Sequence, residues 1–235
     1  MSFNYSPKIV TDGLVLCLDA GNTRSYPGSG TAWNDLSKEG NNGTLINGPT
    51  FNTGSGGSIV FDRVDDYVSC NSNTNAGSNF SVFAWINPGN INIRNGIVGN
   101  SYSFGDRQGF YLSTATNYGG TTNTFFISVG QDQAYRTAAN NSISLNRWNY
   151  IGGIVSNGGQ DIKLYSNGIE TSYLGGFLSS NVVLYNNNQL LIGSRNTNTP
   201  EPFAGNIAQV SIYNKILSAQ EILQNYNATK TRYGL

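Results

Sequence analysis

Three aspartates crowded into one short stretch give this chain its clearest potential for metal chemistry. They are Asp62, Asp65 and Asp66 in the sequence FDRVDDYV. Calcium binds several oxygen ligands at once, and carboxylates in loops at the rim of a β-sandwich supply them readily. The cluster is therefore a candidate calcium site. The alternative is that Asp62 caps a turn while Asp65 or Asp66 orders the hairpin through local backbone hydrogen bonds.

The acidic residues do not form the pattern expected of a glycoside hydrolase. That reaction needs two carboxyl groups, about 5 Å apart for retention or about 6.5–9.5 Å apart for inversion. The glutamates fall in predicted turns, a loop and a helix, and they are Glu39, Glu170, Glu201 and Glu221. The chain has no histidine, which excludes Ser-His-Asp and Cys-His nucleophilic chemistry. We predict that the protein is not an enzyme, and a hydrolase is the alternative.

Aromatic rings near amide and charged side chains form the second chemically useful group. A ring packs against the apolar C–H face of a sugar, while amides and carboxylates bind its hydroxyls. These side chains concentrate in the turn-rich segment 92–123, and one tryptophan lies in the earlier loop GTAWNDLS. The candidate ligand-binding residues are Tyr102, Asp106, Arg107, Tyr118 and Trp33. The alternative for each aromatic residue is packing within the fold.

The elements that position these residues are mostly β-strands, because apolar residues alternate with polar ones or occur in short runs. Predicted strands cover Leu14–Leu18, Ser58–Phe61, Phe80–Ile86, Gly109–Ser113, Phe125–Val129, Trp148–Val155, Ile162–Gly168, Leu190–Gly193 and Ile207–Tyr213. Stretches rich in Asn, Gly, Ser and Thr, which favour turns, separate them. Strands at this spacing, without intervening helices, predict an all-β antiparallel sandwich.

A single short helix is predicted near the C-terminus, at about 218–227. Ser218 stands three residues before Glu221, the pattern of a capping box, and apolar residues follow at helical spacing. A chain of 235 residues without a linker or a shift in composition fits one domain. We predict an N-terminal arm at 1–12, which docks on this domain or on a neighbouring subunit, and one domain at 13–235.

The predicted surface is polar but nearly uncharged. Charged residues make up 11% of the chain, and 13 basic residues balance 13 acidic ones without any run of Lys or Arg. The positive field that holds nucleic acid or anionic lipid is missing, so we expect neither nucleic-acid binding nor membrane insertion. The opening residues lack the pattern of a secretion signal. Cys17 and Cys70 could pair in principle, but they lie in the apparent strands LVLCLD and YVSC, where we expect free, buried thiols.

Several short signatures occur in an order that resembles the laminin-G-like jelly-roll domains of the concanavalin A-like superfamily. They are GLVLCLDAGNTRSYPGSGTAWNDLS (13–37), GTLINGPTF (43–51), SIVFDRVDDYVS (58–69), FSVFAWINP (80–88), RWNYIGGIVSNGGQDIKLYSNG (147–168), LLIGSRN (190–196) and FAGNIAQVSIYNKILSAQEI (203–222). The resemblance covers nearly the whole chain. It implies a concanavalin A-like jelly roll, and calcium sites occur in that family.

Two positions depart from the pattern of that family. The chain has Arg63 where the family often has glycine, and it has Ala208 and Gln209 where the family often has an acidic pair. The second departure removes carboxylates near the last strand. We therefore do not carry over a metal or ligand site of the family to that strand.

The block at 13–37 and the closing run NYNATKTRYG at 225–234 look like domains of structural proteins from tailed bacteriophages, cyanophages among them. This resemblance implies a virion component, assembled in the host cytoplasm, such as a tail-fibre, receptor-binding or capsid-decorating protein. The expected partners are a surface polysaccharide or glycan and other virion proteins, and we expect a homo-oligomer. The alternative is a purely structural assembly protein, whose terminal segments 1–11 or 227–235 become ordered only in the assembly.

Overall fold

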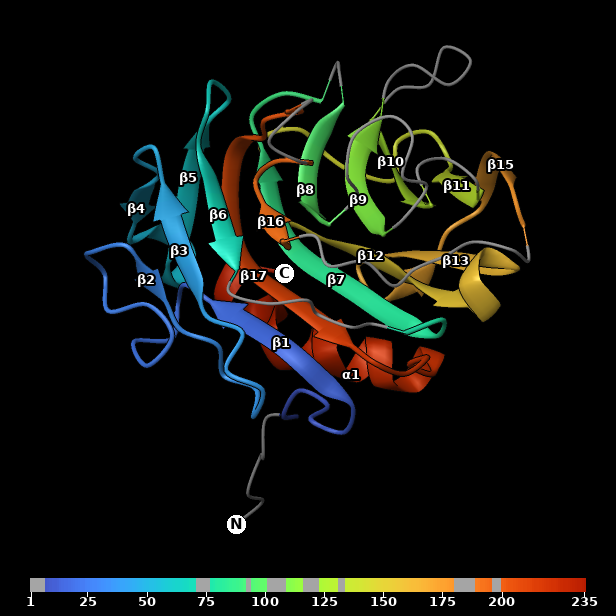
Figure 1. Cartoon of the computed structure of the whole chain (residues 1–235), viewed down its shortest axis with the longest axis horizontal. Helices are drawn as coiled ribbons and strands as arrows, with labels where there is room; N and C mark the ends of the chain where they lie inside the picture. The colour runs from blue at the N-terminus through green and yellow to red at the C-terminus, as the bar shows by residue number, and fades with distance from the viewer. Residues whose placement is uncertain are drawn as a thin grey trace.

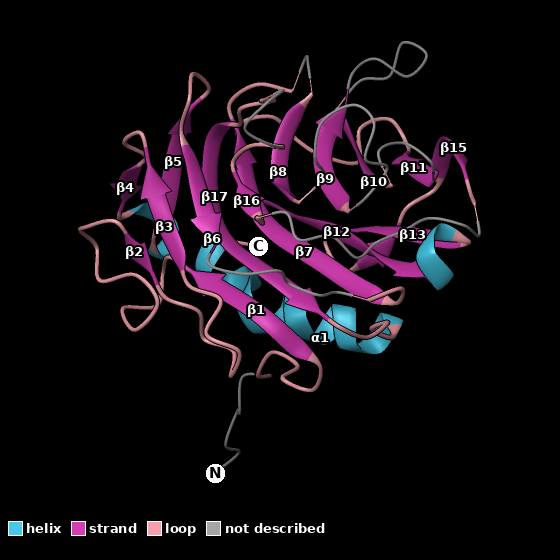
Figure 2. Cartoon of the chain, viewed as in Figure 1, coloured by secondary structure: helices cyan, strands magenta, loops and turns pink. Residues whose placement is uncertain are grey.

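Two antiparallel β-sheets packed face to face, with one α-helix, make up the computed structural model (Figures 1 and 2). The structure describes residues 7–70, 77–91, 94–100, 109–115, 123–130, 134–179, 189–195 and 200–235. This arrangement confirms the all-β antiparallel sandwich expected from the strand pattern. No helix in the described part of the chain is long and apolar enough to cross a membrane.

The first sheet contains eight strands of the described chain, in the order β14-β13-β12-β7-β17-β5-β4, with β1 also paired to β17. Strand β5 pairs with the first part of β17 and β1 with the second part. The bounds are β1 Leu14–Asp19, β4 Thr50–Asn52, β5 Ser58–Asp62, β7 Phe80–Pro88, β12 Asn149–Ser156, β13 Asp161–Ser166, β14 Ile169–Glu170 and β17 Ala204–Tyr213.

The second sheet contains nine strands of the described chain, in the order β15-β11-β10-β9-β8-β16-β6-β3-β2. Their bounds are β2 Ala32–Trp33, β3 Gly43–Ile46, β6 Tyr67–Cys70, β8 Asn95–Gly99, β9 Phe110–Ala115, β10 Thr124–Val129, β11 Ala134–Ala138, β15 Tyr173–Phe177 and β16 Leu191–Ile192. Short 3-10 turns lie at Gly54–Gly56 and Asn157–Gly159. Every strand pair in both sheets of the described chain is antiparallel.

Side chains that point alternately to the two faces of each strand build the core between the two sheets. In β10, Phe125, Ile127 and Val129 belong to the central hydrophobic cluster. Phe126 and Ser128 alternate with them and project from the outer face of the nine-stranded sheet. Burial of this apolar layer is the main favourable contribution to folding.

The C-terminal segment covers the outer face of the eight-stranded sheet (Figure 1). Helix α1 (Ala219–Thr229) begins with the predicted capping box between Ser218 and Glu221, and a 3-10 turn at Lys230–Tyr233 follows it. The helix therefore starts where predicted and runs two residues further. Its apolar side chains and those of the sheet form a second buried cluster of Val10, Phe83, Trp85, Tyr150, Ile154, Tyr165, Ala208, Tyr213, Leu217, Ile222 and Tyr233.

The described end of the predicted N-terminal arm docks on its own domain. The side-chain amide of Gln224 donates to the carbonyl of Lys8 at 2.7 Å, and the amide of Val10 donates to Oδ1 of Asn225 at 2.7 Å. Both acceptor and donor side chains belong to α1. The sequence left open whether the arm docks on its own domain or on a neighbouring subunit. Residues 8–10 dock on their own domain.

The C-terminal tail also packs on its own domain. Arg232 forms an ion pair with Asp19 at 2.6 Å, and the ring centroid of Tyr233 lies 4.1 Å from that of Trp85. The alternative of a purely structural assembly protein expected a tail ordered only in an assembly. For residues 227–235 that expectation is wrong, because the tail lies on its own domain, with Tyr233 in the buried cluster on the eight-stranded sheet.

The edge of β1 that faces away from β17 is closed by the segment 35–41. The carboxylate of Asp35 accepts the amide of Cys17 at 2.8 Å, and the amide of Leu36 donates to the carbonyl of Cys17 at 2.9 Å. The side chain of Asn41 donates to the carbonyl of Val15 at 2.7 Å. These bonds occupy backbone groups that another strand would otherwise recruit.

Both cysteines are free and buried, as predicted. Burial raises the pKa of the Cys17 and Cys70 thiols to about 12. At neutral pH both groups therefore stay protonated and act as small hydrophobic side chains.

Candidate functional site

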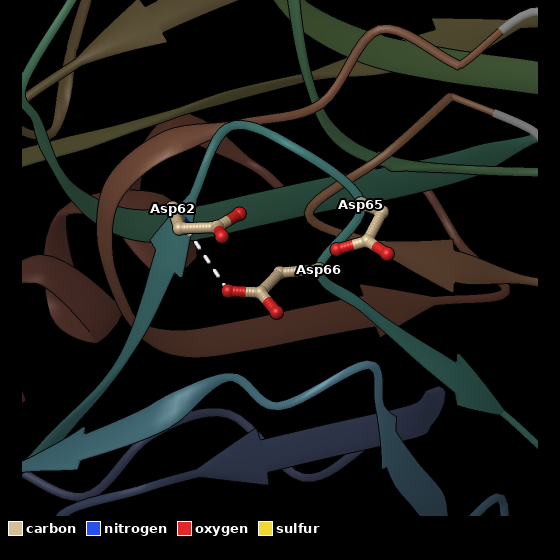
Figure 3. Close-up of side chains that lie close together, drawn as sticks. All are labelled: Asp62, Asp65 and Asp66. Carbon is tan, nitrogen blue, oxygen red and sulfur yellow. Dashed lines mark hydrogen bonds between the residues drawn. The ribbon is translucent and has the colours of Figure 1, made fainter.

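The structure brings the three aspartates of the candidate calcium site together at the turn between β5 and β6 (Figure 3). Asp62 ends β5, while Asp65 and Asp66 come just before β6. One oxygen of each carboxylate lies within 4.8 Å of the others. Arg63, in the same turn, has a φ of 69°, which is in the left-handed region that favours glycine. This conformation explains why glycine suits the position in the family that the sequence resembles.

Local hydrogen bonds hold the turn in shape. Oδ1 of Asp62 accepts the amide of Val64 at 2.7 Å, and Oδ2 of Asp66 accepts the amide of Asp62 at 3.0 Å. The side chain of Asn47 donates to the carbonyl of Asp65 at 2.9 Å. The turn-ordering bonds expected as the alternative are thus present, and they gather the carboxylates instead of dispersing them.

Three carboxylates this close repel one another unless a proton or a cation intervenes. Asp66 is only 5% exposed. Its burial raises the pKa of that carboxyl above the ordinary value of 3.8, and the nearby charges of Asp62 and Asp65 raise it further. Carboxylate oxygens are ligands that calcium prefers, so the donor set fits this cation.

Calcium is expected to raise the melting temperature of the protein, by about 5–10 °C at a concentration about 100-fold above its Kd. Asp66→Asn removes one of the converging charges but keeps an oxygen for the amide of Asp62. This variant is expected to lose most of the calcium-induced rise, and to melt no lower than the wild type when chelator is present. Differential scanning calorimetry with calcium and with chelator measures both. A wild-type curve that does not change with calcium contradicts the site.

The pH dependence of this effect follows from the raised pKa of Asp66. A carboxyl whose pKa is higher in the folded state favours folding most below its unfolded pKa, and this contribution is lost as the pH rises through the folded pKa. Without calcium, Asp66 therefore favours folding at acidic pH and ceases to do so above its raised pKa. With calcium the pH dependence of stability reverses, because the ion binds the ionised carboxylates.

A cavity of about 220 Å³ lies beside this turn. Two of the aspartates line it together with an amide, an aromatic ring, a hydroxyl and apolar side chains. The lining residues are Asn47, Val64, Asp65, Asp66, Tyr67, Leu191, Ser194, Pro200 and Pro202. Hydrogen-bonding groups beside one ring and apolar walls are the combination that binds a sugar unit.

A larger hollow of about 650 Å³ lies beside the start of β1 and has a different lining. Its described lining residues are Thr11, Asp12, Gly13, Leu14, Val15, Leu36, Ser37, Lys38, Glu39 and Asn214. None of these residues is aromatic, and the carboxylate of Asp12 is held by Lys215 at 2.6 Å. This hollow therefore offers no ring for a sugar, and the smaller cavity is the better candidate site.

The carbohydrate-binding residues proposed from the sequence are not those of the cavity. Tyr102, Asp106, Arg107 and Tyr118 lie outside the described residues. Trp33 forms part of β2 and is fully buried. Its ring is not available at the surface, so the surface role is wrong for Trp33 and the alternative, packing within the fold, holds.

Three polar or aromatic side chains of the cavity were missed by sequence reasoning. Asn47 follows β3, Tyr67 begins β6 and Ser194 follows β16. Strand pairing brings them together, because β6 lies between β3 and β16 in the nine-stranded sheet. Only the position of Tyr67, next to the aspartates in FDRVDDYV, was a usable signal in the sequence.

Burial explains why the last strand has Ala208 and Gln209 where the family that the sequence resembles often has an acidic pair. Ala208 is fully buried and Gln209 is 6% exposed, on the sheet that the C-terminal segment covers. The side chain of Gln209 donates to Sγ of Cys17 at 3.9 Å. A pair of carboxylates here would be buried in an apolar layer, so neutral side chains suit these positions.

A family model described as the concanavalin A-like lectin/glucanases superfamily, Laminin_G_3, matches residues 62–223. The matched stretch begins at the aspartate turn and covers more than half of the chain. No curated protein sequence matches the chain.

Several solved structures share the fold. Domain 4 of AbnA, a GH43 extracellular arabinanase from Geobacillus stearothermophilus, in complex with arabinotriose, has a TM-score of 0.68 and 16% identity, with 92% of this chain and 100% of that chain covered. The receptor binding domain of botulinum neurotoxin C/D mosaic serotype has a TM-score of 0.67 and 18% identity, with 92% and 51% covered. The binding domain of Paraclostridial Mosquitocidal Protein 1 has a TM-score of 0.66 and 18% identity, with 92% and 52% covered.

The present chain thus spans about half of the toxin binding domains and all of the arabinanase domain. Identities this low show a common fold and nothing finer. The concanavalin A-like jelly roll expected from the sequence is confirmed.

Proposed function

Because the chain belongs to the Laminin_G_3 family of the concanavalin A-like lectin/glucanase superfamily, we propose that it is a non-catalytic recognition domain that binds a surface glycan. The binding site is the cavity beside the aspartate turn. The lining of this cavity carries the proposal, since Asn47, Asp65 and Ser194 line it together with Tyr67. Amides, carboxylates and hydroxyls bond to sugar hydroxyls, and the ring packs on the C–H face.

Calcium has a defined role in this proposal. Asp62, Asp65 and Asp66 would hold the ion, which would neutralise their carboxylates at the wall of the cavity and brace the turn that carries them. Sugar hydroxyls are neutral oxygen ligands of the kind that complete the shell of a hard cation. Glycan binding is then expected to weaken when calcium is removed.

The arrangement of the carboxylates favours binding over hydrolysis. A glycosidase places its acid and its nucleophile or base on two sides of the bond that it cleaves. Here the three aspartates belong to one turn and face one another (Figure 3). Glu201, close to the cavity in sequence, is held by Arg195 at 3.2 Å. These described carboxylates therefore do not form an acid and nucleophile pair on two sides of an open groove.

The comparisons support a glycan as the ligand class. The arabinanase domain, which this chain matches over its full length, is in complex with arabinotriose. A binding domain of botulinum neurotoxin DC is in complex with SialylT, although this chain spans only about half of that domain. The arabinanase match is the stronger support, because about half of the neurotoxin domain lies outside the matched part.

The proposal extends to the setting in which the domain acts. The sequence resemblance at 13–37 and 225–234 supports a place in a tailed-phage particle, as a tail-fibre, receptor-binding or capsid-decorating protein. The domain would be assembled into the virion in the host cytoplasm, next to other virion proteins and copies of itself. Its glycan would then belong to the surface of the host cell.

Binding of the purified protein to bacterial cells and to their extracted surface polysaccharides tests this function. Saturable binding is expected with calcium and weaker binding with chelator. Tyr67→Ala is expected to lower the affinity about tenfold, because the cavity loses its only described ring. Lys38→Ala, in the larger hollow, serves as the matched control and is expected to bind like the wild type.

The opposite result is equally informative. Absence of binding across hosts and conditions overturns the recognition role and favours the purely structural assembly protein. Equal losses in Tyr67→Ala and Lys38→Ala would mean that the cavity beside the aspartates is not the site.

A further inference from the structure

Five Asn-Gly pairs occur in the sequence, and all of them lie in described parts of the chain. They are Asn42-Gly43, Asn47-Gly48, Asn95-Gly96, Asn157-Gly158 and Asn167-Gly168. An asparagine side chain is attacked most easily by the backbone nitrogen that follows it when the next residue is glycine, because glycine has no side chain in the way and a freely rotating backbone. Burial and hydrogen bonding determine which pair can react, since the reaction needs an unpaired glycine N–H and access for water.

In four of the pairs the fold buries the glycine. The buried glycines are Gly43, Gly96, Gly158 and Gly168. The amide of Gly96 donates to the carbonyl of Glu201 at 2.7 Å. The amide of Gly158 donates to the carbonyl of Ser78 at 2.8 Å. A backbone nitrogen that is held in this way cannot turn toward the preceding side chain, so these two pairs are protected.

The other two buried glycines follow asparagines whose side chains are held in place. Oδ1 of Asn42 accepts the amide of Asp35 at 2.8 Å. Oδ1 of Asn167 accepts the amide of Tyr150 at 3.0 Å. Attack on either side chain would break a bond to the backbone of another segment, which is unfavourable. We therefore expect these pairs to be protected as well.

Asn47-Gly48, at the wall of the cavity beside the aspartate turn, differs from the other four pairs, because both of its residues are exposed. Gly48 has a φ of 110°, and a Cβ there would meet no heavy atom within 4 Å. Its N–H has no hydrogen-bond partner among the described residues. The side chain of Asn47 is held only through Nδ2, which donates to the carbonyl of Asp65 at 2.9 Å. The attacking nitrogen is thus unpaired and open to water.

We propose that Asn47 is a site of deamidation. The backbone nitrogen of Gly48 bonds to Cγ of Asn47, the bond from Cγ to Nδ2 breaks, and ammonia leaves with the proton of the Gly48 amide. Water then adds to the succinimide ring and opens it to an aspartate or an isoaspartate. Either product carries a carboxylate where the side-chain amide was. Water is the only co-reactant, and no atom is oxidised or reduced.

Deamidation changes the charge of the candidate site, and this consequence rests on the proposed function. Asn47 lines the cavity together with Asp65 and Asp66. A carboxylate cannot donate to the carbonyl of Asp65, and it adds a negative charge beside the three aspartates of the turn. Calcium affinity rises with the charge of the ligand set, so deamidated protein is expected to bind calcium more tightly and to depend on it more for stability.

Incubation of the purified protein at mildly alkaline pH, followed by peptide mapping with mass spectrometry, tests the modification. Alkaline pH speeds the attack because the amide of Gly48 must lose its proton. Deamidation at Asn47 is expected to be at least about tenfold faster than at the four buried pairs, which must first open locally. Asn47→Gln is expected to remove it, because the longer side chain would have to close a larger ring.

Asn157→Gln is the matched control, because Asn157 is exposed but is followed by a buried glycine whose amide is held. This variant is expected to deamidate at Asn47 as fast as the wild type. Deamidation that is no faster at Asn47 than at the other four pairs overturns the proposed site.

Asn47→Asp, which carries the charge of one product, tests the consequence for calcium. In chelator it is expected to melt about 2–4 °C below the wild type, because it loses the bond to Asp65. In calorimetric titration it is expected to bind calcium about threefold to tenfold more tightly. Unchanged calcium affinity, or no calcium binding by either protein, overturns this consequence. Polysaccharide binding by the unmodified protein tests the proposed function separately, so the two can fail independently.

Discussion

Replacing Trp85 with alanine is expected to lower the free energy of unfolding by about 3–5 kcal/mol. Trp85 belongs to β7, and its side chain is fully buried under the C-terminal segment. Its ring centroid lies 4.1 Å from that of Tyr233, and its Nε1 donates to Oγ1 of Thr229 at 2.8 Å. Alanine therefore leaves a cavity and removes the surface on which the tail packs. Urea denaturation followed by circular dichroism measures the change.

Two further variants separate packing from hydrogen bonding at this position. Trp85→Phe keeps a ring but loses the bond to Thr229, and is expected to cost less than alanine. Trp148→Ala is the matched control, because Trp148 is only partly buried, although its ring also contacts Tyr233, at 4.7 Å. Equal losses for Trp85→Ala and Trp148→Ala would show that the deeper burial of Trp85 adds nothing to its contribution to stability.

The strands that were predictable from the sequence are those with a clear apolar pattern. The predicted Phe80–Ile86 and Ile207–Tyr213 correspond to β7 and β17, the central strands of the eight-stranded sheet. These strands are buried on both faces, so their apolar runs are long. The predicted strand Ile162–Gly168 ends earlier, at Ser166, because Asn167 and Gly168 have φ angles of 51° and 82° and form the turn.

Short strands containing glycine were missed, and packing explains them. Strand β8 contains Gly96, where a Cβ would lie 2.5 Å from the backbone nitrogen of Arg195, so a neighbouring segment occupies the space of a side chain. Strand β15 contains Gly175 and Gly176 and lies at the edge of its sheet. Glycine lowers strand propensity, so tertiary contacts and not local pattern determine these strands.

The candidate site was predictable only where it is local in sequence. Asp62, Asp65 and Asp66 are grouped by a single turn, which a sequence pattern can indicate. Asn47 and Ser194 join them through the register of β3, β6 and β16. No periodicity specifies which of several strands become neighbours, so this half of the cavity required the structure.

Removing the carboxylate of Asp35 is expected to lower the free energy of unfolding by about 2–4 kcal/mol. Four hydrogen bonds converge on it, from the amides of Cys17, Ser37 and Asn41 and from the hydroxyl of Ser37. Asp35→Ala leaves these donors unpaired and releases the segment that closes the edge of β1. We therefore also expect more self-association, seen by light scattering, because an uncovered edge strand pairs readily with another chain.

A graded series shows whether the carboxylate itself is responsible. Asp35→Asn keeps one acceptor oxygen and replaces the other with a donor, so its loss of stability in urea should fall between wild type and Asp35→Ala. Asn34→Ala, at an exposed neighbouring position, is expected to change stability by less than about 0.5 kcal/mol. If Asp35→Ala and Asn34→Ala unfold at the same urea concentration, the segment 35–41 does not hold β1. If only Asp35→Ala is destabilised and self-associates, this one carboxylate both stabilises the fold and protects its edge.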